Sequence, residues 1–240
     1  MGWQSPVVYP DVVNAEEYMH LSRRASENDG AVSLYTDEYI ANYRRNNYLD
    51  PDAYPIIDWQ DQLMTGNGFT HNHTLSMSAG SERIRVMTSL GYLDQNGIIK
   101  NANFKRYNLR NNMDIRMNDR LNFRLDIAAT YSRRAANPYQ SSVFGFMNSK
   151  DPLMLAQWSD GSYAPFTGGT VNPLPMIEQG VGGNNIRQNG VLKASAALEY
   201  KPVQWLTLEV KAAPQLTAVK THRFVDLVEY HSDPYGTVSK

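Results

Sequence analysis

The chain contains no cysteine, which excludes disulfide bonds, thiol nucleophiles and cysteine metal ligands from its 240 residues. It has no apolar run approaching the roughly 18 residues of a transmembrane helix, and its mean hydropathy is −0.50. It also has no marked excess of charge of either sign, since the net charge is −1, so nothing indicates nucleic-acid binding. Short segments in which apolar and polar residues alternate are present instead.

The alternation is clearest between residues 69 and 134, where four segments have a period of two. Short polar turns at 80–82 and 118–119 and a longer loop at 95–103 separate these segments. Because a period of two puts one set of side chains on each face of a sheet, the pattern predicts an antiparallel meander. A further strand pair is predicted at 188–224, with its turn at Pro202.

One face of the predicted sheet is apolar and the other is charged. Eight charged residues share the second face: Arg83, Arg85, Arg106, Arg110, Asp114, Arg116, Arg124 and Asp126. In a soluble protein the apolar face would cover a core. In a transmembrane barrel the apolar face would meet lipid and the charged face a wet lumen. The alternation alone fits both architectures.

Strand length and loop asymmetry favour the barrel. The segments run for about 10 to 14 residues, against roughly 5 to 6 in soluble domains and roughly 9 to 11 in membrane-spanning strands. The turns are short at one end, whereas 1–68, 95–103 and 135–187 are long connections at the other, as in bacterial outer-membrane barrels. The predicted fold class is all-β with small helical loop insertions, a partial, open, antiparallel up-and-down transmembrane β-barrel of about six to eight strands.

Tyr92, Tyr107 and Tyr131 fall on the apolar face, each near the long-loop end of its strand. Tyrosines at one height are typical of the aromatic girdle at a membrane interface. Ordinary packing is the alternative for any one of them.

Short helices are predicted in the long connections. Asn14 suits an N-cap, with Glu17 completing a capping box, and Arg23 and Arg24 are expected near the C-terminal end of this helix. Further helices are predicted from Thr36 through about Arg45 and over 141–148, and residues 58–60 are expected to lead into the first long strand.

Several pieces of the sequence carry a family resemblance. They are GWQSP at 2–6, NAEEYM at 14–19, DWQDQLM at 58–64, THNHTLSMSAGSE at 70–82, SLGYLDQNGIIKNANFKRYNLRNNMD at 89–114 and the strand pair at 121–131. Together, in this order and at this spacing, they resemble the SusC/RagA family of TonB-linked outer-membrane transporters of Bacteroidetes. The resemblance is strong over 1–134, and beyond it only the pattern of strands and loops persists.

The resemblance implies a non-enzymatic outer-membrane protein without a cofactor. Its full-length form would be a plugged barrel of about 22 strands that imports an oligosaccharide or peptide, with TonB and a SusD-like surface lipoprotein as partners. The implied division is 1–9, the end of a strand; 10–68, a helical extracellular loop; 69–134, a four-strand meander; 135–187, a long extracellular loop; 188–224, a strand pair; and 225–240, the start of the next loop. No plug, TonB-contacting segment or signal peptide is found, so a longer parent protein is expected.

Two groups of residues are candidates for function. The eight charged residues are predicted to face the lumen and to pair across strands or with the plug; a solvated charged face is the alternative. Trp158, Tyr163 and Phe166 lie among glycines in 135–187, where aromatic rings can stack on sugars; packing between loops or against the lipoprotein is the alternative.

No catalytic or metal site is predicted. His71 and His73 share a strand face, but no third ligand lies nearby. A soluble β-rich glycan-binding module is the alternative function. An outer-membrane barrel enzyme is a second, which would need a nucleophile and base that the sequence does not show.

Overall fold

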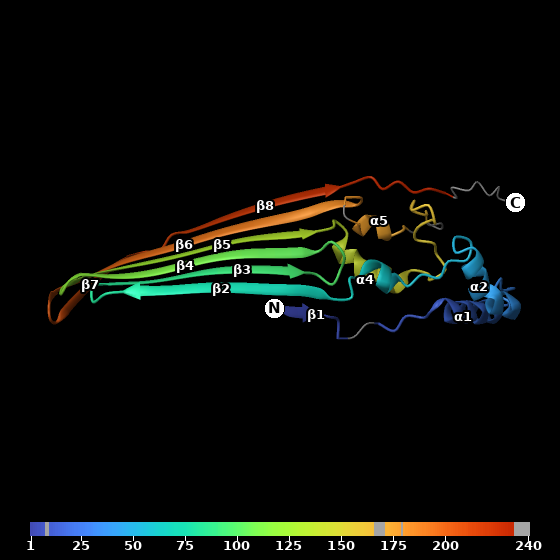
Figure 1. Cartoon of the computed structure of the whole chain (residues 1–240), viewed down its shortest axis with the longest axis horizontal. Helices are drawn as coiled ribbons and strands as arrows, with labels where there is room; N and C mark the ends of the chain where they lie inside the picture. The colour runs from blue at the N-terminus through green and yellow to red at the C-terminus, as the bar shows by residue number, and fades with distance from the viewer. Residues whose placement is uncertain (8–9, 166–170, 179, 233–240) are drawn as a thin grey trace.

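The computed structural model describes residues 1–7, 10–165, 171–178 and 180–232. One long antiparallel sheet has short turns at one end and helices gathered beyond the other (Figure 1). The strands are β1 (Gly2–Gln4), β2 (Gly68–Gly80), β3 (Ile84–Asn96), β4 (Asn103–Asn118), β5 (Leu121–Ala136), β6 (Gly183–Val203), β7 (Leu206–Ala212) and β8 (Gln215–Val225).

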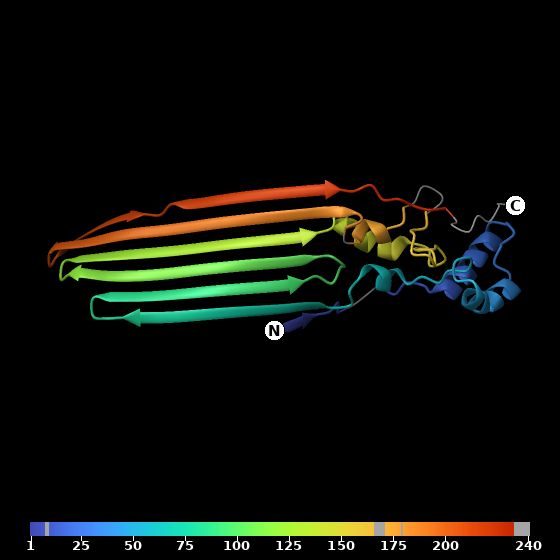
Figure 2. The same cartoon turned by 45° about the horizontal axis from the view of Figure 1, so that its top comes forward.

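The strands pair in chain order from β1 to β7, and β8 also pairs with β6 (Figure 2). β7 and β8 lie in line along the same edge of β6, β7 beside its Ala196–Val203 part and β8 beside its Gly183–Lys193 part. The break between β7 and β8 falls at Pro214, because proline has no N–H to donate to the neighbouring strand. In the part of the chain that the structure describes, the sheet is up-and-down, has eight strands and is not closed. The predicted open, antiparallel, up-and-down sheet with small helical insertions is therefore confirmed, and its place in a membrane stays a prediction.

The turn predicted at Pro202 is wrong in position. Pro202 lies within β6, and the turn is formed by Gln204 and Trp205. The register of β6 with β7 shifts between Tyr200 and Val203. Because the ladder is irregular there, a residue without an N–H donor is tolerated inside the strand.

The helices are α1 (Ala15–Asn28), α2 (Asp37–Leu49), α3 (Trp59–Leu63), α4 (Val143–Ser149), with a 3-10 turn at Gln140–Ser142 before it, and α5 (Leu174–Ile177). The predicted capping box is confirmed: the Asn14 side chain accepts from the Glu17 N–H, and Glu17 Oε2 accepts from the Asn14 N–H, both at 3.0 Å. Thr36 caps α2 by accepting from the Tyr39 N–H at 3.1 Å.

Three expectations about the helices are wrong. Arg23 and Arg24 are not in the last turn of α1, because the helix continues to Asn28 and ends just before Gly30, whose φ of 69° suits a glycine. α2 runs to Leu49 and so is longer than predicted. Residues 58–60 do not lead directly into a strand, because the Asp58 carboxylate caps α3.

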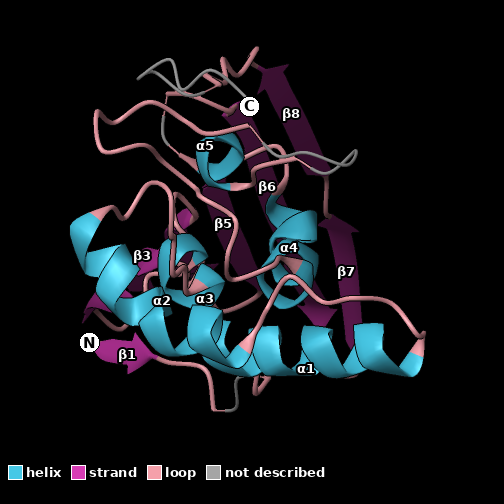
Figure 3. Ribbon diagram, turned by 90° about the vertical axis from the view of Figure 1, so that its right-hand side faces the viewer, coloured by secondary structure: helices cyan, strands magenta, loops and turns pink. Residues whose placement is uncertain are grey.

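The helices α1 to α5 and the segments that connect them lie beyond the long-loop end of the sheet, in a region that we call the helical end. The two buried clusters lie in this region and not on the sheet. One cluster comprises Trp59, Leu63, Met64, Ile99, Val143, Met147, Ala156, Leu174 and Ile177, and a second comprises Met19, Ile40 and Tyr43. The first cluster joins α3 to α4 and α5, and the Trp59 Nε1–H donates to the Asp151 carbonyl at 3.0 Å. Seen end-on, the helices lie in front of the strand ends (Figure 3). No helix in the described ranges is both long and apolar enough to cross a membrane.

Candidate functional site

The register gathers the apolar side chains of β2 to β8 on one surface, which we call the apolar face. Its members include Leu75, Met77, Val86, Leu90, Leu109, Met113, Leu125, Ile127, Leu192, Leu198, Val210 and Leu216. Leu75 is directly opposite Leu90, which is opposite Leu109. Leu75 and Leu216 are 57% and 68% exposed, and no described element packs over them (Figures 1 and 2). An apolar surface of this extent needs an apolar neighbour.

A polar residue within the apolar face has its hydrogen bond supplied from the neighbouring strand. The Asn111 Nδ2 donates to Thr88 Oγ1 at 2.8 Å, and the two residues are register partners. This bond offsets the cost of placing an amide in apolar surroundings. At this point of the apolar face, the polar side chains are therefore hydrogen-bonded to each other.

Three predicted tyrosines form one row across the apolar face, which we call the tyrosine row. Tyr92 is the register partner of Tyr107, which is the partner of Tyr131. Their ring centroids are 5.0 Å and 6.3 Å apart. The common height and face expected from the sequence are therefore present, and the role as a membrane girdle stays a prediction.

The opposite surface, which we call the charged face, holds the eight charged residues of the sequence prediction at its strands and turns. Arg85, Asp114 and Arg124 occupy one register row across β3, β4 and β5. Arg106 and Arg110 lie on β4, Asp126 on β5, and Arg83 and Arg116 lie close to the turns. Their assignment to a lumen stays a prediction.

Cross-strand pairs on the charged face include partners that sequence reasoning did not identify. Arg124 lies 3.9 Å from a carboxylate oxygen of Glu199 and 3.6 Å from one of Glu209. Glu199 also binds Lys201 at 3.0 Å. The alternation of polar and apolar residues in 191–212 placed Glu199 and Glu209 on this face. It could not identify their partners, because these depend on the register between strands.

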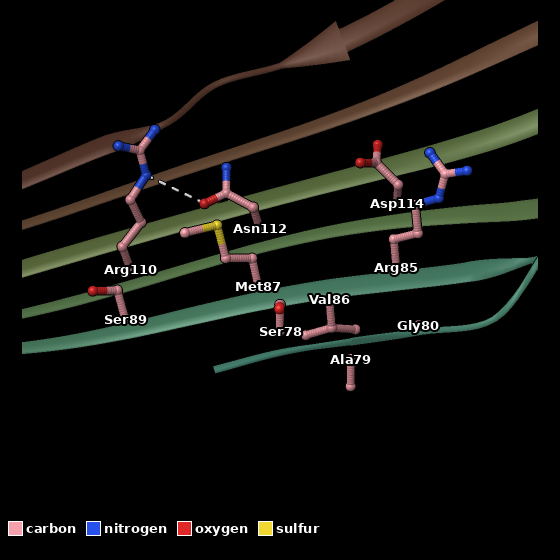
Figure 4. A pocket seen from close by; sticks show the side chains of 10 residues that line it. All are labelled: Ser78, Ala79, Gly80, Arg85, Val86, Met87, Ser89, Arg110, Asn112 and Asp114. Carbon is pink, nitrogen blue, oxygen red and sulfur yellow. Dashed lines mark hydrogen bonds between the residues drawn. The ribbon is translucent and has the colours of Figure 1, made fainter. Parts of the chain in front are cut away.

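A depression of about 700 Å³ lies toward the short-turn end of the charged face. Arg85, Arg110, Asn112 and Asp114 line it, and the Arg110 and Asp114 side chains project from the same side of the sheet (Figure 4). The Arg110 Nε donates to Asn112 Oδ1 at 3.2 Å. Guanidinium groups beside a carboxylate can bind carboxylates, hydroxyls and amides of a ligand or of a neighbouring protein segment.

The loop aromatics occupy a small hairpin in the segment before α5. The Trp158 Nε1–H donates to the His231 carbonyl at 2.7 Å, and the Tyr163 hydroxyl donates to Glu178. Burial, together with that carboxylate, raises the pKa of Tyr163 to about 12. Phe166, the third predicted residue, lies outside the described residues. The polar groups of Trp158 and Tyr163 thus have protein partners, and binding of a sugar by these rings stays a prediction.

No family model matches the chain. TonB-dependent receptor P26 of Formosa agariphila is 28% identical over 179 residues, which cover 73% of this chain and 17% of the receptor. TonB-dependent receptor SusC of Bacteroides thetaiotaomicron is 40% identical over 50 residues, 21% of this chain and 5% of SusC. The structure of the RagAB peptide importer in its closed-closed state matches with a TM-score of 0.65 at 17% identity, over 92% of this chain and 27% of that chain.

The chain is SusC/RagA-like. It spans less than a third of each of these relatives' own chains. The proteins it resembles are named as a TonB-dependent receptor and a peptide importer. In this SusC/RagA-like chain, the apolar face and the charged face of the sheet are the candidate functional surfaces.

Proposed function

We propose that this SusC/RagA-like chain forms part of the barrel wall of an outer-membrane, TonB-dependent nutrient transporter. The observation that carries the proposal is the uncovered apolar face backed by the charged face, on strands of one sheet. Lipid covers the first face, and the second lines a wet lumen. The named relatives, which are TonB-dependent receptors, support the same role.

The strands are long enough for this role. β4 and β5 have 16 residues each. At about 3.3 Å per residue this gives roughly 50 Å, enough to cross a hydrocarbon layer of about 30 Å even when tilted by about 45°. We assign the helical segments 10–68 and 135–187 to the extracellular side, because long loops lie there in outer-membrane barrels. The tyrosine row then marks the outer interface.

The proposed cargo is an oligosaccharide or peptide, and the proposed partners are TonB and a SusD-like surface lipoprotein. The similar RagAB protein is described as a peptide importer. Val32 and Leu34, between α1 and α2, are 97% and 87% exposed at the helical end. Exposed apolar side chains on the extracellular side favour a protein partner there.

A soluble glycan-binding module is the weaker alternative. It requires a protein layer over the apolar face, and the described residues place their buried clusters at the helical end instead.

Replacing Arg110 by glutamate in the full-length transporter is expected to reduce uptake several-fold. The change puts a carboxylate beside Asn112 and near Asp126. The new carboxylate repels Asp126 and any acidic group of the lumen or plug that pairs with Arg110. Uptake of labelled substrate and the amount of protein in the outer membrane are measured together. Arg120→Glu in the turn before β5 is the matched control and should leave uptake unchanged. Unchanged uptake and stability in the Arg110 variant would contradict the lumen assignment.

A further inference from the structure

A polar groove of about 930 Å³ lies on the apolar side of the sheet, beyond the tyrosine row. Phe69, Asn103, Arg133 and Ile186 line it from the strands, and their register puts them on the same side as the tyrosine row. Glu178 lines it from the helical end. The groove therefore sits where the apolar face ends and the helical end begins.

Basic side chains form a row between the tyrosine row and the helical end. Lys105 and Arg133 are direct register partners, and Gln188 and Lys220 continue the same row on β6 and β8. Lys105 binds Asp94 at 3.1 Å. For Arg133 and Lys220, no ion pair is formed within the described residues. The row is thus cationic over β4 to β8.

The one carboxylate in this row is already fully engaged. Asp94 accepts from the Tyr92 hydroxyl at 3.0 Å and from Asn103 Nδ2 at 2.8 Å, in addition to Lys105. It has little capacity left for Arg133. Like charges directly opposite on neighbouring strands are unfavourable, so Lys105 beside Arg133 favours an anion held between them.

A second, independent feature of the groove is a donor without an acceptor. Asn137 is 3% exposed and lines the groove, and its Nδ2 is buried with no hydrogen-bond partner in the described part of the chain. Its Oδ1 is used by the Tyr139 N–H at 2.9 Å. Native proteins rarely leave such a donor unpaired, so it favours a ligand that presents acceptor oxygens.

We infer that this groove binds the phosphorylated sugar headgroup of an outer-leaflet glycolipid. Lys105 and Arg133 hold the phosphate, Asn137 and the asparagine amides of the groove bind sugar oxygens, and the acyl chains lie over the apolar face below the tyrosine row. The inference rests on the proposed function, because it takes the apolar face to meet lipid. It adds a site and a ligand class on the side opposite the charged face.

Glu178 and Asp226 also line the groove and bring two carboxylates to it, Glu178 from just after α5 and Asp226 from just after β8. Glu178 accepts from the Tyr163 hydroxyl, and Asp226 accepts from the Leu227 N–H at 2.9 Å. Lys105 and Arg133 lie at the end of the groove next to the tyrosine row, where a headgroup phosphate sits when its acyl chains enter the membrane.

The test uses the full-length transporter in nanodiscs of neutral phosphatidylcholine. Binding of bisphosphorylated lipid A, of its dephosphorylated form and of inorganic phosphate is measured by native mass spectrometry. The double variant Lys105→Glu, Arg133→Glu is compared with Arg106→Glu, Arg134→Glu, which makes the same charge change one position away on the same two strands and on the opposite face.

The wild type should bind the bisphosphorylated lipid in preference to the other two probes. The Lys105 and Arg133 variant should bind it about thirtyfold more weakly, since each basic residue contributes roughly one kcal/mol at an anionic surface and about 1.4 kcal/mol is tenfold. The Arg106 and Arg134 variant should bind it normally. If the charge reversal does not assemble, Lys105→Gln, Arg133→Gln is tested in its place against the same control.

Equal binding by both double variants, or equal affinity for the dephosphorylated lipid, would overturn the inference while leaving the transporter proposal intact. Binding of inorganic phosphate as tightly as the lipid would show an anion site and not a lipid site. Failure of the wild type to insert into nanodiscs would overturn the transporter proposal and the glycolipid site with it.

Discussion

Replacing Met113 by lysine is expected to reduce the stability of the membrane-inserted protein by about 2 to 4 kcal/mol, the cost of a basic residue on the lipid face near the bilayer midplane. Met113 lies on the apolar face of β4, opposite Val86 on one side and Leu125 on the other. In lipid its ammonium group would have no acceptor and no water. Equilibrium folding of the full-length transporter from urea into bilayers measures the change.

Asn112→Lys is the matched control, because residue 112 is the adjacent position on the same strand but on the charged face. Its side chain donates to Asp126 at 2.6 Å, so a lysine there has a carboxylate within reach. The control should change stability by less than about 1 kcal/mol, as surface ion pairs do. Similar losses in both variants would show that the two faces do not differ in solvent, contrary to the barrel assignment.

Replacing Trp59 by alanine is expected to destabilise the helical end by about 3 to 5 kcal/mol, the usual cost of removing a buried aromatic side chain. Trp59 is 3% exposed, packs in the cluster of Val143 and Leu174, and donates its indole N–H to the Asp151 carbonyl. Its loss therefore releases two segments far apart in the sequence. Faster hydrogen exchange and proteolysis at 140–178 should report this.

Trp205→Ala provides the control for the tryptophan change. Trp205 is 84% exposed in the turn between β6 and β7, so its removal should leave exchange in the helical end unchanged. The strands should keep their protection in both variants, because the sheet contributes almost nothing to the buried clusters. Cooperative unfolding of the sheet in the Trp59 variant would contradict the separation of the two regions.

The sheet was predictable because its signals are local. Alternation fixes the face of each residue, and short turns fix the register of the neighbouring strands. The tyrosine row follows from these two facts alone. The capping box at Asn14 was equally predictable, because both of its hydrogen bonds join residues three apart. The turn predicted at 118–119 is one residue off, because Asn118 still pairs with Leu121 and the turn is formed by Asp119 and Arg120.

The helical end was less predictable because its core is assembled from distant segments. Trp59 meets Val143 and Leu174 with no periodic pattern connecting them, and α5 is too short to show a helical period. The same limit applies to the candidate sites. Arg124 was predicted on the charged face, but its partners Glu199 and Glu209 depend on the register of β5, β6 and β7.

We propose that one face of this sheet meets lipid and the other meets water. Single cysteines for spin labels are introduced along β4 at residues 107 to 115 of the full-length transporter in bilayers. These 240 residues contain no cysteine of their own, and any cysteine elsewhere in the transporter is replaced first. We expect labels at 107, 109, 111, 113 and 115 to be accessible to oxygen, and labels at 108, 110, 112 and 114 to be accessible to a water-soluble nickel complex. Collision rates without this alternation, or with water on both faces, would contradict it.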